Sequence, residues 1–322
     1  IGDLEDQEVT VWNGKEWSKT TVVKTSPLES VVSVDTDDGA TIDCTKYHKW
    51  YVVKRDKSGK LRGMIEKRTH ELQAGDELIK SEGYDTVLHG SARLDFPYES
   101  GFVTGDGCER GRTDDKGLEL TLYKQSNKFF LKDVFKGYSS STNLDGNAVF
   151  RWKYGTLLGK YNIPDSSFVL QDRLQWLAGL LDADGSILKG GESFILNTSK
   201  KDFAQKVKLF LQELGVDCTC GLYSNSKTTA FSKKTSNDYQ EIPREPLYVV
   251  RVHAKGVTRL LELGLKCKRL DLVKSEKSRS TSSKFVKIVS VSDFGRETPV
   301  FCFTEPKRHM GMFNGILTGQ CN

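Results

Sequence analysis

Hydrophobic positions follow two different periods along this chain. Near the start, short apolar runs at 9–12 and 31–34 lead into the pairs Asn13-Gly14 and Asp38-Gly39. Such pairs between β-forming runs predict tight hairpin turns. Similar runs lie at Trp50–Val53, Glu77–Ile79, Phe285–Val291 and Val300–Phe303. The sequence therefore predicts β structure at both ends of the chain.

In the middle, the apolar period changes to that of a helix. Four residues recur at helical spacing: Leu174, Leu177, Ala178 and Leu181. Gly179 within this helix allows another backbone to approach closely. Gly185 is predicted to end the helix in the left-handed conformation. An α/β middle between all-β ends indicates one domain interrupted by another.

The predicted helix delivers two acids to its end, Asp182 and Asp184. A weaker copy of the same pattern, SGFVTGDG at 100–107, places Thr104 and Asp106 at the corresponding positions. Two such helices packed together would bring Asp106 and Asp184 side by side, where a cation is needed to offset their repulsion. Hard oxygen ligands with retained waters suit Mg²⁺. Taken singly, each acidic segment is more typical of a structural, solvated turn than of a metal site.

The nonapeptide LAGLLDADG at 177–185 resembles the signature of the LAGLIDADG homing endonucleases. The copy at 100–107 then corresponds to the first half of a pseudo-dimer within one chain. The resemblance implies a pseudo-symmetric α/β endonuclease over residues 94–283, acting as a monomer. It further implies that Asp106 and Asp184 bind Mg²⁺ and that the substrate is double-stranded DNA, the allele of a host gene that lacks the insertion. Phosphodiester hydrolysis would follow metal-stabilised in-line displacement.

That family also has a lysine before its second signature. The stretch LLGKYNIP at 157–164 resembles this block and offers Lys160, although the family spacing K-x-I-P is here K-Y-N-I-P. The symmetric counterpart falls in LGLKCKR at 263–269, with Lys266 or Lys268 as candidates. Such a lysine could assist the attacking water or stabilise phosphate charge. A surface lysine, or one that only positions phosphate, is the alternative.

The net charge of +5 is unevenly distributed. Residues 200–284 hold 18 Lys and Arg against 9 Asp and Glu, which leaves the rest of the chain at −4. A basic block beside a metal site is expected of a DNA-binding protein. An ordinary solvated face is the alternative.

The end of the chain resembles a second family. Residues 300–321, VFCFTEPKRHMGMFNGILTGQC, are similar to the C-terminal splicing block of an intein, with Asn314-Gly315 as its turn and His309 as its internal histidine. Upstream, Thr45 and His48 form the T-x-x-H pattern of another intein block. The resemblance implies an all-β Hedgehog/intein-type (Hint) splicing domain in two parts, residues 1–93 and 284–322, around the endonuclease.

The usual first nucleophile of an intein is absent, because Gly2 stands where Cys or Ser is expected and Ile1 becomes the last residue of the upstream extein. Trp50, Cys302 and Thr318 match the Trp-Cys-Thr set of class 3 inteins, in which the internal cysteine attacks the upstream junction directly. The alternative is a class 1 intein whose first nucleophile was removed by engineering.

The splicing resemblance also implies roles for individual residues. His48 would donate a proton to the departing amine, and Thr45 would orient or polarise the same amide. The branch formed on Cys302 would pass to Cys321, the first residue of the downstream extein. Gln320 stands where a terminal Asn is usual and would cyclise slowly to a six-membered ring. With Gly319 at the place of the usual penultimate His, His309 is the remaining acid-base partner.

Several predictions concern context. Splicing is expected to need no cofactor, and its substrates are the exteins in cis. Ile1 and the Cys321-Asn322 pair belong to these exteins. In the alternative register, Asn322 is the last residue of the intein. Seven cysteines without a disulfide framework favour a reducing intracellular compartment, the cytoplasm or a nucleus, with Cys218 and Cys220 as packing residues. No apolar run approaches the roughly 20 residues that span a bilayer. An inactive, DNA-binding relic of the endonuclease and a free-standing nuclease are competing functions.

Overall fold

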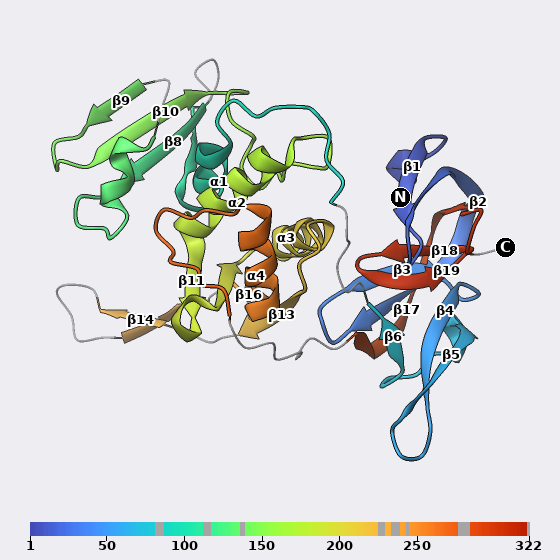
Figure 1. Ribbon diagram of the computed structural model, residues 1–322. Coiled ribbons are helices and arrows are strands. Elements are labelled where there is room, and N and C mark those ends of the chain that lie inside the picture. The colour runs from blue at the N-terminus through green and yellow to red at the C-terminus, as the bar shows by residue number, and fades with distance from the viewer. Residues whose placement is uncertain are drawn as a thin grey trace. The chain divides into compact units, whose positions relative to one another are not determined.

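The computed structural model describes residues 1–80, 87–111, 117–135, 139–224, 229–232, 239–242, 245–275 and 284–320 (Figure 1). The chain forms two compact units, each with its own core. The terminal unit comprises Ile1–Glu82 and Ser280–Asn322, and the central unit comprises Gly83–Arg279. The functional domain ranges 1–93, 94–283 and 284–322 stay predictions.

The terminal unit is built on a nine-stranded sheet. In spatial order its strands are β1 (Glu8–Trp12), β2 (Trp17–Thr36), β17 (Phe285–Phe303), β6 (Glu77–Ile79), β4 (Lys49–Arg55), β19 (Ile316–Gly319) and β18 (Met310–Phe313), with β3 (Thr41–Thr45) beside β2 and β5 (Leu61–Arg68) beside β4. Two short 3₁₀ turns, η1 (Gly2–Leu4) and η2 (Thr69–Glu71), complete it. Its core gathers residues from both ends of the chain, including Val34, Trp50, Leu78 and Ile288.

The predicted hairpin turns are present. Asn13 follows β1, and its side-chain Oδ1 accepts the N–H groups of Lys15 and Glu16 at 3.1 and 3.0 Å. The Asn314-Gly315 pair connects β18 to β19, with Phe313 and Ile316 paired across the turn. Both turn residues have positive φ, 46° and 80°, as a two-residue type I′ turn requires.

The two apolar runs predicted near the end of the chain form one continuous strand, β17. It pairs antiparallel with β2 from Ile288↔Thr36 to Phe303↔Val22, with several register shifts along the way. Because β2 supplies partners along this whole length, the polar residues between the two runs also adopt strand structure. The pairing places the last sixth of the chain against the first.

The central unit consists of two similar halves. The helix α1 (Pro97–Asp106) leads into a sheet ordered β7 (Cys108–Arg110), β8 (Gly117–Leu122), β10 (Ala148–Lys153), β9 (Ser139–Thr142). The helix α2 (Leu170–Asp184) leads into a sheet ordered β11 (Gly185–Leu188), β12 (Ser193–Thr198), β16 (Leu247–Val252), β13 (Cys218–Ser224). In both sheets the strands lie in the order first, second, fourth, third, so the halves share one topology.

Smaller elements complete the halves. The first carries a 3₁₀ turn, η3 (Phe129–Asp133). The second carries η4 (Lys189–Gly191), two helices, α3 (Lys201–Glu213) and α4 (Ala254–Leu263), and the ribbon of β14 (Thr229–Ser232) and β15 (Tyr239–Ile242). Cys218 and Cys220 are buried in β13, as packing residues should be.

Helices α1 and α2 approach each other through glycine. A Cβ added at Gly179 would lie 2.0 Å from the carbonyl oxygen of Tyr98, and one at Gly101 would lie 1.8 Å from that of Trp176. Neither contact is possible for a larger residue without moving backbone. The predicted role of Gly179 is therefore confirmed, and Gly101 plays the same role in the first half.

The predicted left-handed terminator at Gly185 is wrong. Gly185 has φ −73° and ψ 150°, which is extended backbone, because the chain passes directly from α2 into β11. Glycine is needed there for space: a Cβ would lie 2.6 Å from the carbonyl oxygen of Leu181.

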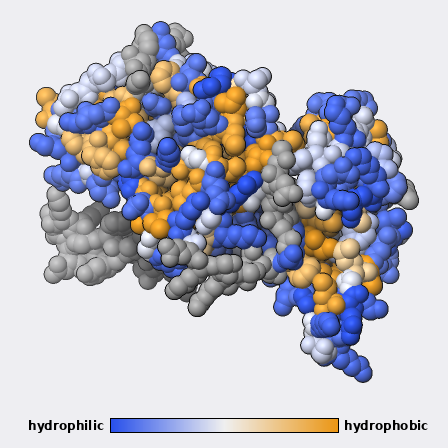
Figure 2. All heavy atoms as spheres, in the orientation of Figure 1, coloured by the Kyte–Doolittle hydropathy of each residue, from blue (hydrophilic) through white to orange (hydrophobic). Residues whose placement is uncertain are grey.

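Polar residues cover much of the face shown in Figure 2, with apolar residues between them. Of the helices in the described part of the chain, none is both long and apolar enough to cross a bilayer. The six cysteines among the described residues form no disulfide with one another.

Candidate functional sites

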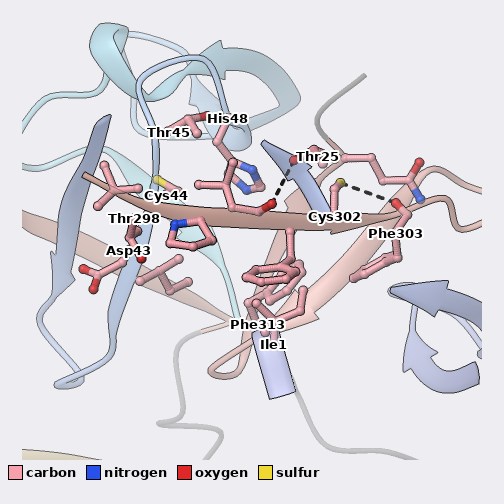
Figure 3. A pocket seen from close by; sticks show the side chains of 18 residues that line it. Ile1, Thr25, Asp43, Cys44, Thr45, His48, Thr298, Cys302, Phe303 and Phe313 are labelled. Atoms are coloured by element: carbon pink, nitrogen blue, oxygen red, sulfur yellow. Dashed lines mark hydrogen bonds between the residues drawn. The ribbon is translucent and has the colours of Figure 1, made fainter. Parts of the chain in front are cut away.

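The terminal unit contains a cavity of about 370 Å³ where several predicted splicing residues meet (Figure 3). Its walls include Gly2, Thr45, His48, Cys302 and Gln320, which come from the start of the chain, from β3 and the turn after it, and from the last strands. The pairing of β17 with β2 accounts for much of this convergence. Residues separated by almost the whole sequence therefore line the same cavity.

The Ile1–Gly2 peptide lies at this cavity. The carbonyl oxygen of Ile1 accepts the N–H of Leu4 at 3.0 Å, because η1 turns the chain back on itself. A Cβ added at Gly2 would lie 2.9 Å from Cε2 of Phe301, so a larger residue would have to displace that ring. Phe301 is the neighbour of Cys302 on β17, and both residues line the cavity together with Ile1 and Gly2.

Cys302 is half-buried in the cavity wall. It stands opposite Val23 of β2, and its Sγ–H donates to the carbonyl oxygen of Phe303 at 3.5 Å. Nearby, the Thr25 hydroxyl donates to the carbonyl oxygen of Val300 at 3.2 Å (Figure 3). Both Cys302 and Thr25 therefore line the cavity from the β2–β17 pair.

His48 is held among aromatic rings. Its ring meets those of Trp50 and Phe313 edge-on, with centroids 5.4 and 6.5 Å apart. Burial lowers the pKa of His48 to about 4 because it disfavours the charged imidazolium. The resting imidazole is therefore neutral near pH 7, and it must first take up a proton before it can act as the acid predicted from the sequence.

Trp50 and Thr318 lie behind the cavity wall. They are directly opposite each other on β4 and β19, and both are fully buried. The indole Nε1–H of Trp50 donates to the hydroxyl of Thr69 at 3.0 Å. Thr69 in turn donates to the carbonyl oxygen of His48 at 3.3 Å, so this buried threonine links the tryptophan to the histidine. No motif in the sequence marks Thr69.

Glu305 is a buried carboxylate that no sequence motif marked. Its oxygens accept the side-chain N–H of Asn13 at 3.0 Å and the backbone N–H groups of Arg308 and His309 at 2.6 and 3.0 Å. Burial alone would raise its pKa, but hydrogen bonds led by those from Asn13 and Ser18 lower the pKa to about 2. The carboxylate is therefore charged and fixes the turn after β17.

The same turn holds Gln320. The side-chain Nε2–H of Gln320 donates to the carbonyl oxygen of Glu305 at 3.3 Å, and its backbone N–H donates to that of His309 at 3.2 Å. The His309 side chain itself is exposed and does not line the cavity. A Cβ added at Gly319 would lie 2.8 Å from Cβ of Lys49, which excludes a penultimate histidine in this packing. Cys321 and Asn322 lie outside the described residues.

In the central unit, the two acids of the signature copies meet at the ends of their helices. Asp106 ends α1 and Asp184 ends α2. The close approach depends on Gly105, where a Cβ would lie 2.8 Å from Oδ2 of Asp184. Protein packed around the Asp184 carboxyl raises its pKa, and the negative charge of Asp106 raises it further. Asp106 also accepts Nζ–H of Lys128 at 2.6 Å.

This pair fits a divalent cation with few protein ligands. Two carboxylates from separate helices already repel each other, and a cation between them would relieve that repulsion. Within the described ranges, no cluster of three or more His, Cys, Asp or Glu side chains forms. Such a site suits Mg²⁺, which keeps several waters when it binds one or two carboxylates.

Asp182, the other acid of the second signature, has a structural role. It is fully buried and accepts the hydroxyl of Tyr98 at 2.9 Å. It also accepts the backbone N–H groups of Lys268, Arg269 and Leu270 at 2.6, 2.9 and 3.1 Å. In the first half its counterpart Thr104 bonds within its own helix. Asp182 thus anchors the segment that follows α4.

The predicted lysines occupy unequal positions. Nζ–H of Lys160 donates to the carbonyl oxygen of Gly107, directly after Asp106. Nζ of Lys268 instead lies 5.2 Å from the centre of the Tyr98 ring, and Lys266 is exposed. The residue that reaches the carbonyl oxygen of Gly185 is Arg269, through Nη2–H at 2.6 Å. Arg269 is the last residue of the LGLKCKR run and was missed as a candidate.

Residues 172–263 match the model of the LAGLIDADG-like domain, which spans α2 and most of the second half. The central unit therefore contains a LAGLIDADG-like domain. Over its whole length, the chain is 29% identical to the ribonucleoside-diphosphate reductase large subunit of Invertebrate iridescent virus 6, over 334 residues.

The chain is also 24% identical to the ribonucleoside-diphosphate reductase NrdEB subunit alpha of Bacillus subtilis (strain 168), with 94% of this chain covered. It spans about a third of the length of these curated relatives, 34% and 32%. Among solved structures, it is similar to I-DmoI in complex with DNA and Mn, at 14% identity and a TM-score of 0.32. That match covers 52% of this chain and 93% of the other.

Proposed function

We propose that this chain is an intein that excises itself and carries a DNA-cleaving homing endonuclease. The observation that carries the splicing part is the shared cavity, in which the Ile1–Gly2 peptide, Cys302 and His48 meet. The observation that carries the nuclease part is the convergence of Asp106 and Asp184 within a LAGLIDADG-like unit.

In the first splicing step, Sγ of Cys302 attacks the carbonyl carbon of Ile1. Neutral His48 takes the thiol proton, directly or through water, and the N–H of Leu4 stabilises the oxyanion because it already donates to that carbonyl oxygen. The bond to the Gly2 nitrogen then breaks, and the imidazolium returns its proton to this nitrogen. The products are a thioester on Cys302 and a free amine on Gly2, with Thr45 orienting the amide.

In the later steps, the thiol of Cys321 attacks this thioester, which moves the acyl group and restores the Cys302 thiol. The side-chain nitrogen of Gln320 attacks its own main-chain carbonyl carbon, forms a six-membered imide and releases the amine of Cys321. That amine takes over the acyl group to complete the ligation. In the structure the Gln320 amide donates to the carbonyl oxygen of Glu305 and must turn away from it, which agrees with a slow final cleavage.

The cavity lining favours class 3 chemistry over an engineered class 1 intein. A Cβ at position 2 would lie 2.9 Å from Cε2 of Phe301, so a cysteine there would require this ring to turn aside. Cys302 already lines the same cavity as the junction. Only class 1 chemistry requires a nucleophilic side chain at position 2, and only class 3 chemistry requires Cys302.

The splicing proposal is tested with the full chain between two tagged exteins. We expect Cys302→Ala to abolish thioester formation and ligation, while Cys108→Ala, an exposed cysteine in the central unit, splices normally. Normal splicing by the Cys302→Ala variant would contradict the class 3 mechanism. Splicing by the double variant Gly2→Cys with Cys302→Ala would support class 1 instead.

For the nuclease, Asp106 and Asp184 would hold Mg²⁺ between the ends of α1 and α2. When bound, the metal supplies Lewis-acid stabilisation of the charge that develops on a phosphodiester during hydrolysis. Glycine contacts between α1 and α2 bring the two acids close together. A basic side chain, Lys160 or Arg269, lies beside the end of each helix. The two sheets would face double-stranded DNA, with base edges read in the major groove.

The host gene proposed for this intein encodes a ribonucleoside-diphosphate reductase large subunit. Support comes from the relatives, which match this chain over 100% and 94% of its length and extend well beyond it. The DNA target would then be the uninterrupted form of that gene, and the exteins would be the two parts of the reductase subunit. We propose that the excised chain acts as a monomer, because it holds both halves of the nuclease.

The nuclease proposal is tested on a plasmid with the uninterrupted gene junction, in buffer with Mg²⁺. We expect double-strand cleavage that Asp184→Asn and Asp106→Asn each abolish without loss of DNA binding. Asp145→Asn, an exposed turn residue of the first half, is the matched control. Binding without cleavage by the unmodified chain would establish the relic instead.

A further inference from the structure

The residue before Gln320 supplies no acid or base for the proposed downstream cleavage. Gly319 has no side chain, and the His309 side chain is exposed and does not line the cavity. Cleavage after Gln320 expels an amine, and a departing amine needs a proton. The proton donor must therefore come from elsewhere in the fold.

The hydroxyl of Tyr51 lies beside this glycine. Trp50 on β4 pairs with Thr318 on β19. This register sets Lys49 opposite Gly319, and Tyr51 lies on the same face at the diagonal position, which an aromatic side chain can reach across. A Cβ added at Gly319 would lie 3.3 Å from Oη of Tyr51. The hydroxyl therefore lies where a side chain at position 319 would begin.

Charged side chains near Tyr51 keep its hydroxyl protonated. Glu66 stands directly opposite Tyr51 on β5, and Arg308 belongs to the turn that holds Gln320. Burial raises the pKa of Tyr51, the negative charge of Glu66 raises it further, and Arg308 lowers it in part. The phenol therefore carries its proton at neutral pH and can donate it near this turn.

Lys49 is the competing donor on the same face. Its Nζ lies 3.8 Å from Oε1 of Glu66 on β5. Since β5 and β19 lie on opposite sides of β4 at this point, the lysine ammonium is turned away from the strand that carries Gly319. Tyr51 is therefore the better placed of the two donors.

We propose that Tyr51 is the proton donor for cleavage after Gln320. This inference rests on the proposed splicing function. Nε2 of Gln320 bonds to its own main-chain carbonyl carbon, and the bond from that carbon to the Cys321 nitrogen breaks. The Tyr51 hydroxyl gives its proton to the departing nitrogen, and the resulting phenolate takes the proton that Nε2 loses. One proton thus passes from the amide to the amine, and the tyrosine is restored.

The test uses the full chain between two tagged exteins. Tyr51→Phe removes the hydroxyl and keeps the ring. We expect branched intermediate to accumulate because its resolution slows about tenfold or more, the least that a positioned proton donor contributes. Formation of the Cys302 thioester, measured with Cys321→Ala to halt the next step, should keep the parent rate. Tyr154→Phe, at an exposed tyrosine of the central unit, is the matched control and should splice normally.

Each other outcome is decisive. Resolution of the branch at the parent rate in Tyr51→Phe would overturn the inference and leave the splicing proposal standing. Equal slowing of both steps would mean that Tyr51 acts only through the stability of β4, and the inference would fail. If Lys49→Gln stops resolution while Tyr51→Phe does not, the lysine is the donor. A parent chain that forms neither thioester nor ligated product would overturn both proposals.

A second measurement distinguishes proton donation from packing. A polyfluorinated tyrosine at position 51 keeps the ring and the hydroxyl but makes the hydroxyl more acidic. The rate of branch resolution in this variant, divided by the parent rate, should fall as pH rises from about 6 to about 9, because the fluorinated hydroxyl loses its proton well below the ordinary tyrosine pKa. A ratio that stays constant with pH would show that the hydroxyl only packs against Gly319, and it would overturn the inference.

Discussion

Trp50 and Thr318 lie directly opposite each other on β4 and β19, although 268 residues separate them in the sequence. Both are fully buried, and the tryptophan ring supports His48 from one side. Two members of the Trp-Cys-Thr set thus form one packed unit behind the cavity, and the third, Cys302, lines the cavity itself. In the proposed mechanism the set would therefore support the histidine as well as supply the nucleophile.

The first prediction concerns the bond between Trp50 and Thr69. Trp50→Phe removes the Nε1–H donor but keeps an aromatic ring, so we expect a loss of about 1–2 kcal/mol in unfolding free energy from an unsatisfied hydroxyl and a smaller ring. Thioester formation at Cys302 should slow because His48 loses support. Chemical denaturation and a thioester assay measure the two effects. Thr69→Val in the Trp50→Phe background should recover part of the lost unfolding free energy. If the losses of the two single variants simply added in the double variant, the hydrogen bond between Trp50 and Thr69 would not couple the two residues.

The second prediction concerns pH. Burial lowers the pKa of His48 to about 4. Between pH 4 and the ordinary value near 6.5, the unfolded chain binds more protons at this residue than the folded chain, so its contribution to stability falls as pH falls through this window. If neutral His48 accepts the thiol proton, the rate of thioester formation should stay level below pH 6.5 and fall only near pH 4.

A rate profile across roughly pH 3.5–8, measured on the Cys302 thioester with Cys321→Ala to halt the next step, spans both the lowered and the ordinary histidine pKa. His48→Gln should lose the inflection. An inflection near pH 6.5 would show that the histidine is solvated in the precursor and would contradict the role derived from its burial.

The third prediction concerns Glu305. Its pKa, lowered to about 2, means that its stabilising effect is present above the ordinary value near 4.5 and is lost as pH falls toward 2. Glu305→Gln keeps the shape and removes the charge, and we expect a loss of roughly 1–3 kcal/mol because several donors then face a neutral acceptor. Thermal unfolding at about pH 7 and about pH 3 measures it. The difference in unfolding free energy between Glu305→Gln and the parent chain should be smaller at the lower pH.

Glu305→Gln should also alter the last splicing step more than the first. The carboxylate fixes the turn that holds Gln320, whereas Cys302 is held by the β2–β17 pair. Branched intermediate should therefore accumulate in this variant. Equal slowing of both steps would mean that Glu305 acts only through overall stability.

The fourth prediction concerns the ion pair between Lys128 and Asp106, 2.6 Å apart. Lys128 and a divalent cation compete for the same carboxylate, so Lys128→Met should lower the Mg²⁺ concentration needed for half-maximal cleavage several-fold. Isothermal titration with Mg²⁺ and the plasmid assay measure this. Lys132→Met is the control. A higher Mg²⁺ requirement in Lys128→Met would mean that this lysine contacts the DNA phosphate instead.

Features with a local signature were predictable from the sequence. The Asn-Gly and Asp-Gly turns, the β ends and the helix that bears LAGLLDADG follow from short-range patterns, because each depends on residues a few positions apart. The helix contact through Gly179 was also predictable, because a glycine among apolar residues on a buried helix face removes the side chain that would keep a second backbone away.

Other features depend on contacts that no local pattern encodes. Asn13 donates to Glu305 across 292 positions, and the pairing of β1 with β2 and of β2 with β17 brings the two residues together. Arg269 was not predicted because the neighbouring lysines have the residue type that the family pattern calls for. In the structure it is position 269, and not 266 or 268, whose basic side chain reaches the end of α2. Gly185 was misjudged because the sequence does not show that a strand begins directly at the helix end.

The backbone N–H of Lys80 donates to the carbonyl oxygen of Lys284 at 3.1 Å, so the two points where the chain leaves and re-enters the terminal sheet are neighbours. A few residues would be enough to join them in place of everything between. A variant in which such a link replaces the central unit is therefore expected to keep the strand order of the terminal sheet, which holds the proposed splicing residues.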